Sequence, residues 1–423
     1  MHVIGETAEI FTHMRSEYIE ACRESYYLLS STSFEGCSGV KIDLTERLQG
    51  RTFPYRMDRY PVGQFPYAAF FWPALVAASA AETASSIAAH FLGFPGDTDG
   101  DRTAQEPVGA TPSTIALELH TVHLRDFAVA QSGVPTLLCM PLALHDAAVA
   151  DLAAGHSLVA ALRGAGIERL FMADWRSASA DMRFLGVDEY LADLNVLVDH
   201  VGGLVDLIGL CQGGWLSLVY AGRFPAKVRK LVMAGAPVDI TARHSPLSAI
   251  AEATPLAMFQ SLVNLGDGRV LGRNLAKFWG NDADANGIRE TLQTLQLIGS
   301  PEFTRLETIF KTWNSWTIDI PGKYYLEVVE KLYKRNELAN GSFVALGQKI
   351  DLSGLRLPMY LLAGSTDEVV APEQLLAVER LVGTPPEYRR HEVAPCNHLG
   401  LFMGKRTLEE YWPRMVRWMK EVD

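Results

Sequence analysis

The hydrophobic pattern of the chain predicts strands and helices that alternate between residues 114 and 240. Apolar and polar residues alternate over 114–130, which is typical of a paired strand, and residues 136–140 begin a series of buried strands. The pattern continues with a helix over 157–166, a strand over 169–173, a helix over 187–201, and strands over 204–210 and 228–234. This rhythm predicts an α/β fold with a mainly parallel sheet and helices on both faces.

Between residue 240 and about residue 342 the strand pattern gives way to helical patterns rich in Met, Leu, Phe and Trp. Strand patterns return over 357–364 and 388–394. We therefore predict a helical cap inserted into the core. The expected parts are an N-terminal helical region and linker (1–113), the first part of the core (114–240), the cap (241–342) and the second part of the core (343–423).

The N-terminal region contains an apolar segment from Phe65 to Ala81, followed by a weakly apolar stretch to Phe94. It is too short and interrupted to span a bilayer, which takes about 20 apolar residues. We interpret it as a helix or helical hairpin that packs on the core or in a homodimer contact. The alternative is a surface that docks on a hydrophobic body.

Composition narrows the functional class. Of the 423 residues 48% are hydrophobic, which is ample for a core, and a formal net charge of −11 argues against a nucleic-acid partner. The five cysteines have no C-x-x-C spacing, which favours a reducing compartment and neither a metal site nor disulfides. Residues 1–20 show no signal peptide, so the expected location is cytoplasmic.

The strand at 205–210 runs into the turn Gly209-Leu-Cys211-Gln-Gly213 and then into a helix-forming run. Gly209 and Gly213 give the clearance that a nucleophile on a sharp strand-to-helix turn needs. The helix start favours a thiolate at Cys211, and the backbone N–H of Gln212 is a candidate oxyanion donor. The alternative is a small apolar cysteine buried in a structural turn.

A catalytic thiol needs a base and an orienting acid, and candidates for both follow predicted strands. Asp367 lies just past the strand at 357–364, and His398 lies in the loop after the strand at 388–394. The carboxyl ends of parallel strands share one sheet edge, so Cys211, Asp367 and His398 are expected to converge there. Glu368 is the rival for the acid, and separate structural roles for Asp367 and His398 are the alternative.

A second oxyanion donor is expected in the loop after the strand at 136–140. Its position there points to the backbone N–H of Leu142 or Ala143. Asp174 and Trp175 follow the next strand, and we interpret them as the anchor of a loop beneath the substrate pocket.

Over roughly residues 114–420 these motifs resemble the polyhydroxyalkanoate synthases and their relatives, the intracellular polyhydroxyalkanoate depolymerases. The resemblance is carried by Gly-Leu-Cys211-Gln-Gly-Gly, by residues 150–159 with Ala-Asp-Trp175 beyond them, and by residues 325–352. It implies an α/β-hydrolase fold with Cys211 as nucleophile, His398 as base and Asp367 as acid.

The chain also departs from the synthase pattern near the expected pocket. Asn397 stands before the histidine where synthases usually carry Gly, and Trp215 follows the double glycine where a small residue is expected. Both are pocket candidates. Residues 371–374 and 401–405 look closer to the depolymerases, and residues 1–113 resemble neither family.

Three functions follow from these observations. The first is a synthase-like acyltransferase that takes a 3-hydroxyacyl-coenzyme A thioester as substrate, binds no cofactor and forms an acyl-thioester at Cys211. The second is a depolymerase or (thio)esterase that uses the same three residues. The third is a non-catalytic protein on a polymer granule surface, suggested by the apolar segment at 65–94.

Overall fold

The computed structural model describes residues 106–274 and 284–421. They belong to a compact unit of residues 64–423, while the unit of residues 1–63 and the apolar segment at 65–94 lie outside the described residues. The predicted N-terminal elements therefore stay predictions.

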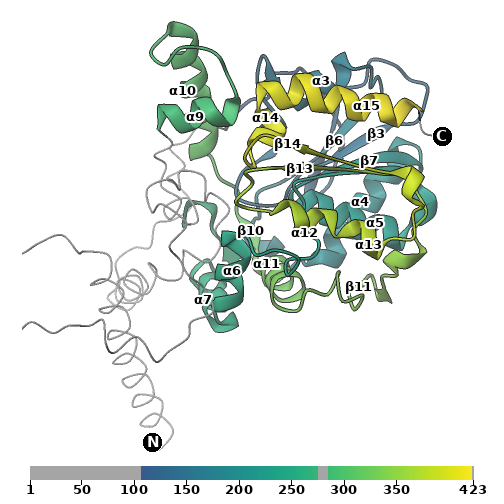
Figure 1. Ribbon diagram of the computed structural model, residues 1–423. Coiled ribbons are helices and arrows are strands. Elements are labelled where there is room, and N and C mark those ends of the chain that lie inside the picture. Colours follow the sequence, from purple (N-terminus) through teal and green to yellow (C-terminus); the bar gives the residue numbers. More distant parts are fainter. Residues whose placement is uncertain (1–105, 275–283, 422–423) are drawn as a thin grey trace, which may run out of the picture. The chain divides into compact units, whose positions relative to one another are not determined.

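The described chain is organised around an eight-stranded sheet in the order β1-β2-β6-β3-β7-β8-β13-β14 (Figure 1). The strands are β1 (Thr114–Glu118), β2 (Val122–Asp126), β3 (Thr136–Cys139), β6 (Leu170–Trp175), β7 (Val205–Leu210), β8 (Val228–Ala234), β13 (Met359–Gly364) and β14 (Arg389–Ala394). The hairpin β1–β2 and its contact with β6 are antiparallel, whereas all pairs from β6 to β14 are parallel. The alternating pattern at 114–130 thus forms a hairpin.

Helices cover both faces of this sheet (Figure 1). Helices α3 (Leu158–Gly164) and α15 (Trp412–Glu421) lie on one face and contact each other. The other face carries α4 (Val187–Val201), α5 (Gln212–Arg223), α12 (Pro372–Leu376) and α13 (Val378–Leu381). Every residue of β3, β6, β7 and β13 is buried, as expected for strands covered on both sides. The predicted α/β-hydrolase fold is confirmed.

The region between β8 and β13 is mainly helical. It contains α6 (Pro246–Ala253), α7 (Leu256–Leu265), α9 (Ala285–Leu292), α10 (Pro301–Ser315), α11 (Gly322–Val328) and a π-helical turn, η4 (Val329–Lys334). It also contains two short ladders that the sequence pattern missed, β9 (Arg269–Val270) with β10 (Ile320–Pro321) and β11 (Val344–Ala345) with β12 (Gln348–Lys349). Strands of two residues are too short to show a period.

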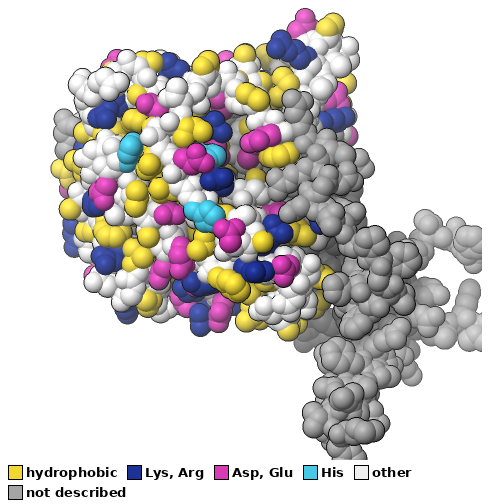
Figure 2. Space-filling view, turned by 180° about the vertical axis from the view of Figure 1, so that it is seen from behind, with side chains coloured by type: hydrophobic (Ala, Val, Ile, Leu, Met, Phe, Trp, Pro, Cys, Tyr) yellow, Lys and Arg dark blue, Asp and Glu magenta, His cyan; other side chains and the backbone are white. Residues whose placement is uncertain are grey.

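The remaining elements are short connections. They are η1 (Ala147–Ala150), β4 (Asp151–Ala153), β5 (His156–Ser157), η2 (Ala180–Phe184), η3 (Pro225–Lys227), η5 (Leu352–Gly354), η6 (Pro386–Tyr388), α14 (Gly400–Met403) and the π-helical η7 (Thr407–Tyr411). Basic and acidic side chains are interspersed over the face shown in Figure 2. Within the described ranges, every helix is too short or too polar to cross a membrane.

Candidate active site

Cys211 occupies the turn between β7 and α5 in a strained backbone conformation, with φ 50° and ψ −118°. Its N–H donates to the carbonyl of Ala234 at 2.9 Å, which ties the turn to β8. A β carbon at Gly209 would lie 2.5 Å from the α carbon of Gly214, and one at Gly213 would lie 2.2 Å from the carbonyl oxygen of Cys139. Only glycine lets the helix start this close to the strands, so the turn has the geometry of a nucleophile elbow.

Gln212 is the first residue of α5, so its N–H belongs to the unsatisfied helix start. Its side-chain Oε1 accepts a hydrogen bond from Nε1 of Trp215 at 2.5 Å, and the hydroxyl of Tyr333 in η4 also hydrogen-bonds to the Gln212 side chain. Trp215 is fully buried and packs against the rings of Tyr324 and Phe343. Trp215 therefore holds the residue that follows Cys211.

Asp367 lies in the turn after β13 and is almost completely buried. Its Oδ1 accepts hydrogen bonds from the N–H groups of Val369 at 2.9 Å and Val370 at 2.8 Å. Its Oδ2 lies 2.7 Å from Nδ1 of His398. Because both oxygens accept bonds, the carboxylate is fixed beside the imidazole.

Glu368 lies beside Asp367 in the sequence, but Nδ1 of His398 bonds to Oδ2 of Asp367. Burial, the Asp367 carboxylate and Glu290 together raise the pKa of Glu368. The distance of 2.7 Å between Oδ2 of Asp367 and Nδ1 of His398 favours Asp367 over Glu368 as the partner of the imidazole.

His398 lies between Asp367 and Cys211. Nδ1 bonds to Asp367, which leaves Nε2 for the hydrogen bond between this ring and the Cys211 thiol. Burial alone lowers the pKa of His398, but the Asp367 carboxylate and Cys211 outweigh it and raise the pKa to about 10. The imidazole is almost fully buried and packs edge-to-face with the ring of Phe402, with 5.3 Å between the ring centroids. The structure thus brings the three predicted residues together with the imidazole poised to carry a proton.

The other two cysteines in the described ranges differ from Cys211. Cys139 and Cys396 are buried free thiols, and burial raises the pKa of each to about 12. Across residues 106–274 and 284–421, no group of three or more His, Cys, Asp or Glu side chains is arranged to hold a metal ion.

The loop after β3 contains the expected second oxyanion donor, Leu142, which is buried together with Ala143. This loop is anchored by Trp175, whose Nε1 donates to the carbonyl of Met140 at 2.8 Å. The neighbouring Asp174 accepts from Nε of Arg125 at 2.7 Å. Trp175 therefore supports the loop that leads to Leu142, whereas Asp174 is paired with β2.

Asn397 makes hydrogen bonds on both sides of its amide. Nδ2 donates to the hydroxyl of Thr291 at 2.9 Å, and Oδ1 accepts from the N–H of Gly400 at 2.9 Å. No pattern in the sequence pointed to Thr291 or to Gln293, which also bonds to this loop, since both are more than 100 positions away along the chain.

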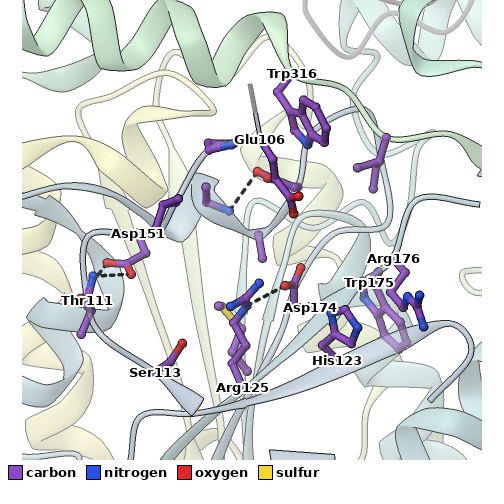
Figure 3. A pocket seen from close by; sticks show the side chains of 18 of the residues that line it. Glu106, Thr111, Ser113, His123, Arg125, Asp151, Asp174, Trp175, Arg176 and Trp316 are labelled. Carbon is purple, nitrogen blue, oxygen red and sulfur yellow. Dashed lines mark hydrogen bonds and ion pairs between the residues drawn. The ribbon is translucent and has the colours of Figure 1, made fainter. Parts of the chain in front are cut away.

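A pocket of about 550 Å³ lies beside the loop after β3 (Figure 3). Its lining combines Arg125, Arg176 and His123 with the carboxylates of Glu106, Asp146, Asp151 and Asp174. The excess of acidic groups opposes binding of phosphate groups. Neither the three converging residues nor Trp215 or Asn397 line it, so this pocket is separate from the site around Cys211.

Comparison with known proteins supports the resemblance. Residues 300–423 match the family model described as PHB de-polymerase C-terminus. Three relatives are called poly(3-hydroxyalkanoate) polymerase subunit PhaC. The one from Synechocystis sp. is 28% identical over 74% of this chain and 85% of its own length. The one from Allochromatium vinosum is 25% identical over 75% of this chain and 90% of its own length. The one from Haloferax mediterranei is 24% identical over 76% of this chain and 66% of its own length.

Solved structures with similar folds include a monoacylglycerol lipase from Paleococcus ferrophilus, with 17% identity, a TM-score of 0.47 and coverage of 71% of this chain and 98% of that one. A Bacillus megaterium epoxide hydrolase has 14% identity and a TM-score of 0.48, and the match covers 74% of this chain and 100% of that one. The fold assignment itself rests on the strand order and the parallel pairings. The sequence matches confirm that this α/β-hydrolase-fold chain resembles the polyhydroxyalkanoate synthases and depolymerases, as its motifs predicted.

Proposed function

We propose that this protein is a polyhydroxyalkanoate synthase-like acyltransferase that acts on 3-hydroxyacyl-coenzyme A through Cys211, His398 and Asp367. The observation that carries the proposal is the chain of contacts from the Cys211 thiol through the His398 imidazole to the Asp367 carboxylate, 2.7 Å from Nδ1. The relatives named as polymerase subunits support the choice of substrate.

In the proposed reaction, Nε2 of His398 takes the proton of the Cys211 thiol, and the thiolate attacks the thioester carbonyl. The backbone N–H groups of Gln212 and Leu142 stabilise the oxyanion, each by about 3 kcal/mol. Collapse of the intermediate breaks the bond to coenzyme A, whose thiolate receives the proton from His398. The product is an acyl-thioester at Cys211.

The second half of the reaction decides between synthesis and hydrolysis. In synthesis, His398 removes the proton from the 3-hydroxyl of another acyl group, whose oxygen attacks the acyl-thioester and forms an ester bond while Cys211 regains its proton. In hydrolysis, water attacks in its place. The match of residues 300–423 to the depolymerase C-terminus supports hydrolysis as the second candidate.

The test is to incubate the full-length protein with 3-hydroxybutyryl-coenzyme A, follow free thiol release, and identify the acyl product, with Cys211→Ala as the control. We expect an oligomer or polymer and loss of release in Cys211→Ala by a factor on the order of 1000 or more. Free 3-hydroxybutyrate as the main product would instead establish the hydrolase.

Binding to a polymer granule surface and homodimerisation extend this proposal, and both concern the apolar segment at 65–94. Cosedimentation with poly(3-hydroxybutyrate) granules and light scattering measure them. Granule binding without any Cys211-dependent thiol release or polymer hydrolysis would support the third, non-catalytic function.

A further inference from the structure

We propose that Thr291, Gln293 and Asn397 are positioning residues that fasten the end of helix α9 to the loop carrying His398 and thereby set the distance from its imidazole to Cys211. The inference rests on the proposed function, because it takes Cys211 and His398 as the reacting pair. It assigns roles to three residues outside that pair.

Asn397 fixes the backbone immediately before His398 and just after it. Its Nδ2 donates to Oγ1 of Thr291 at 2.9 Å, and its Oδ1 accepts from the N–H of Gly400 at 2.9 Å. Thr291 is fully buried, so its hydroxyl has no solvent alternative as a partner. The short segment that holds the imidazole is therefore tied to α9 by a side chain of its own.

Gln293 makes a second set of bonds to the same part of the chain. Its Nε2 donates to the carbonyl of Pro395 at 3.3 Å, and its Oε1 accepts from the N–H of Thr407 at 3.0 Å and from its hydroxyl at 3.1 Å. These partners lie on either side of His398 in sequence. Gln293 thus connects Pro395, at the start of the loop that carries His398, with Thr407, which follows helix α14.

The backbone of Gln293 is in the left-handed region, with φ 51° and ψ 35°. This conformation costs about 1 kcal/mol for a residue with a β carbon. A glycine would cap α9 without that strain. The strained conformation is offset by the three bonds that the Gln293 side chain makes to Pro395 and Thr407, on either side of His398.

The approach of α14 to α9 depends on two glycines (Figure 1). A β carbon at Gly404 would lie 2.6 Å from Oε1 of Gln293, and one at Gly400 would lie 3.3 Å from the carbonyl oxygen of Thr291. A side chain at Gly404 would displace the Gln293 amide or the end of α14, and one at Gly400 would crowd Cys396 and Asn397 as well as α9.

The segment that begins with α9 also reaches the loop after β3. The N–H of Ile318 donates to the carbonyl of Leu144 at 2.9 Å, and Nδ1 of His145 donates to the carbonyl of Trp316 at 3.0 Å. Residues 291–318 therefore connect the loop of the base with the loop of the proposed oxyanion donor Leu142. A displacement of about 1 Å between such groups can lower a rate about 100-fold.

The main test compares Thr291→Val, which keeps the shape but removes the hydroxyl, with Thr291→Ser, which keeps the hydroxyl. We expect kcat for thiol release from 3-hydroxybutyryl-coenzyme A to fall about tenfold in Thr291→Val and Asn397→Gly, with KM within about twofold. Thr291→Ser retains the native kcat. The double variant of Thr291→Val and Asn397→Gly is no slower than Asn397→Gly alone, because Asn397→Gly already removes the hydrogen bond that Thr291→Val breaks.

Gln293→Gly separates positioning from stability. The substitution relieves the left-handed strain but also removes three hydrogen bonds, so the two effects oppose each other and Tm changes by only a few degrees, while kcat falls about tenfold. Gln296→Gly is the matched control, because Gln296 is an exposed residue three positions further along. It leaves both quantities unchanged.

Alkylation of Cys211 by iodoacetamide, located by mass spectrometry of the modified peptide, gives a readout that needs no substrate. If the native protein releases no thiol but Gln293→Gly slows alkylation of Cys211 about tenfold, the proposed substrate is wrong and the positioning role stands. If Thr291→Val, Asn397→Gly and Gln293→Gly all keep native kcat and native alkylation within twofold, the inference is overturned.

Discussion

The elbow that carries Cys211 and the loop that carries His398 lie at the same edge of the sheet but are held by different forces. The elbow is held by backbone contact, since β carbons at Gly209 or Gly213 would overlap atoms of α5 and β3. The histidine loop (residues 395–399) is held by hydrogen bonds. His398 and Asn397 donate to Asp367 and Thr291, and the carbonyl of Pro395 accepts from Gln293 at the end of α9.

This difference predicts how each region tolerates change. Overlap of backbone atoms cannot be relieved by a rotamer change, so substitutions in the elbow act on folding. A lost hydrogen bond leaves the backbone path intact, so substitutions around His398 act on the geometry of catalysis and leave most of the fold in place.

The largest expected effect on stability is that of Gly213→Ala at the elbow. Its β carbon would lie 2.2 Å from the carbonyl oxygen of Cys139, so the free energy of unfolding should fall by about 3 kcal/mol. Gly164→Ala is the control, because a β carbon there meets no atom within 4 Å and should stabilise α3 by up to about 1 kcal/mol. Urea denaturation measures both, and equal midpoints for Gly213→Ala and the native protein would show that the elbow can relax.

Asp367→Asn tests the histidine loop without removing atoms from it. The Asn side chain can still accept from Val369 and Val370 through its carbonyl oxygen, so the turn is retained. The amide cannot stabilise an imidazolium as the carboxylate does, so kcat for thiol release should fall on the order of 1000-fold. Far-ultraviolet circular dichroism checks the fold, and a loss below tenfold would show that another group orients His398.

The pH dependence of stability sharpens the comparison, because it measures the charged contacts that His398 makes with Asp367 and Cys211. The pKa of His398 is raised to about 10 in the folded protein. A raised pKa contributes stability that is fully present below the unfolded value, about 6.5, and is lost as pH rises through 10. Tm should therefore fall by several degrees between pH 7 and pH 10 in the native protein.

The control for this prediction is His398→Gln, which lacks the titrating group. Its Tm should fall less over the same interval. Equal falls in the two proteins would show that the ionisation of His398 does not contribute to stability.

The contrast between the two regions also explains what the sequence could predict. The elbow is contiguous, and its glycine spacing between β7 and α5 follows directly from steric requirements. Asp367 and His398 were predicted because each follows a predicted strand, an apolar one at 357–364 and a more polar one at 388–394. Strand ranges such as 228–234 matched the structure because buried parallel strands leave continuous apolar runs.

The supports of the histidine loop could not be predicted in this way. Thr291 and Asn397 are 106 positions apart, and a hydrogen bond between two polar side chains leaves no period in either segment. Asn397 was singled out as a pocket residue because of its place before His398, yet the oxygen and the nitrogen of its amide bond to Gly400 and Thr291. The fold and the three converging residues were therefore more predictable than the residues that hold His398 in place.

The smallest expected effect is that of Glu368→Gln. Both Asp367 and Glu368 follow β13, and only Asp367 lies at 2.7 Å from Nδ1 of His398. The pKa of Glu368 is raised by burial, by Asp367 and by Glu290, so its charge is unfavourable in the folded state. The neutral amide should therefore leave kcat within about twofold and leave Tm at pH 8 equal or slightly higher. A loss of kcat comparable to that of Asp367→Asn would mean that the two carboxylates act as one unit on His398, and the loop would then depend on the whole turn after β13 for its position.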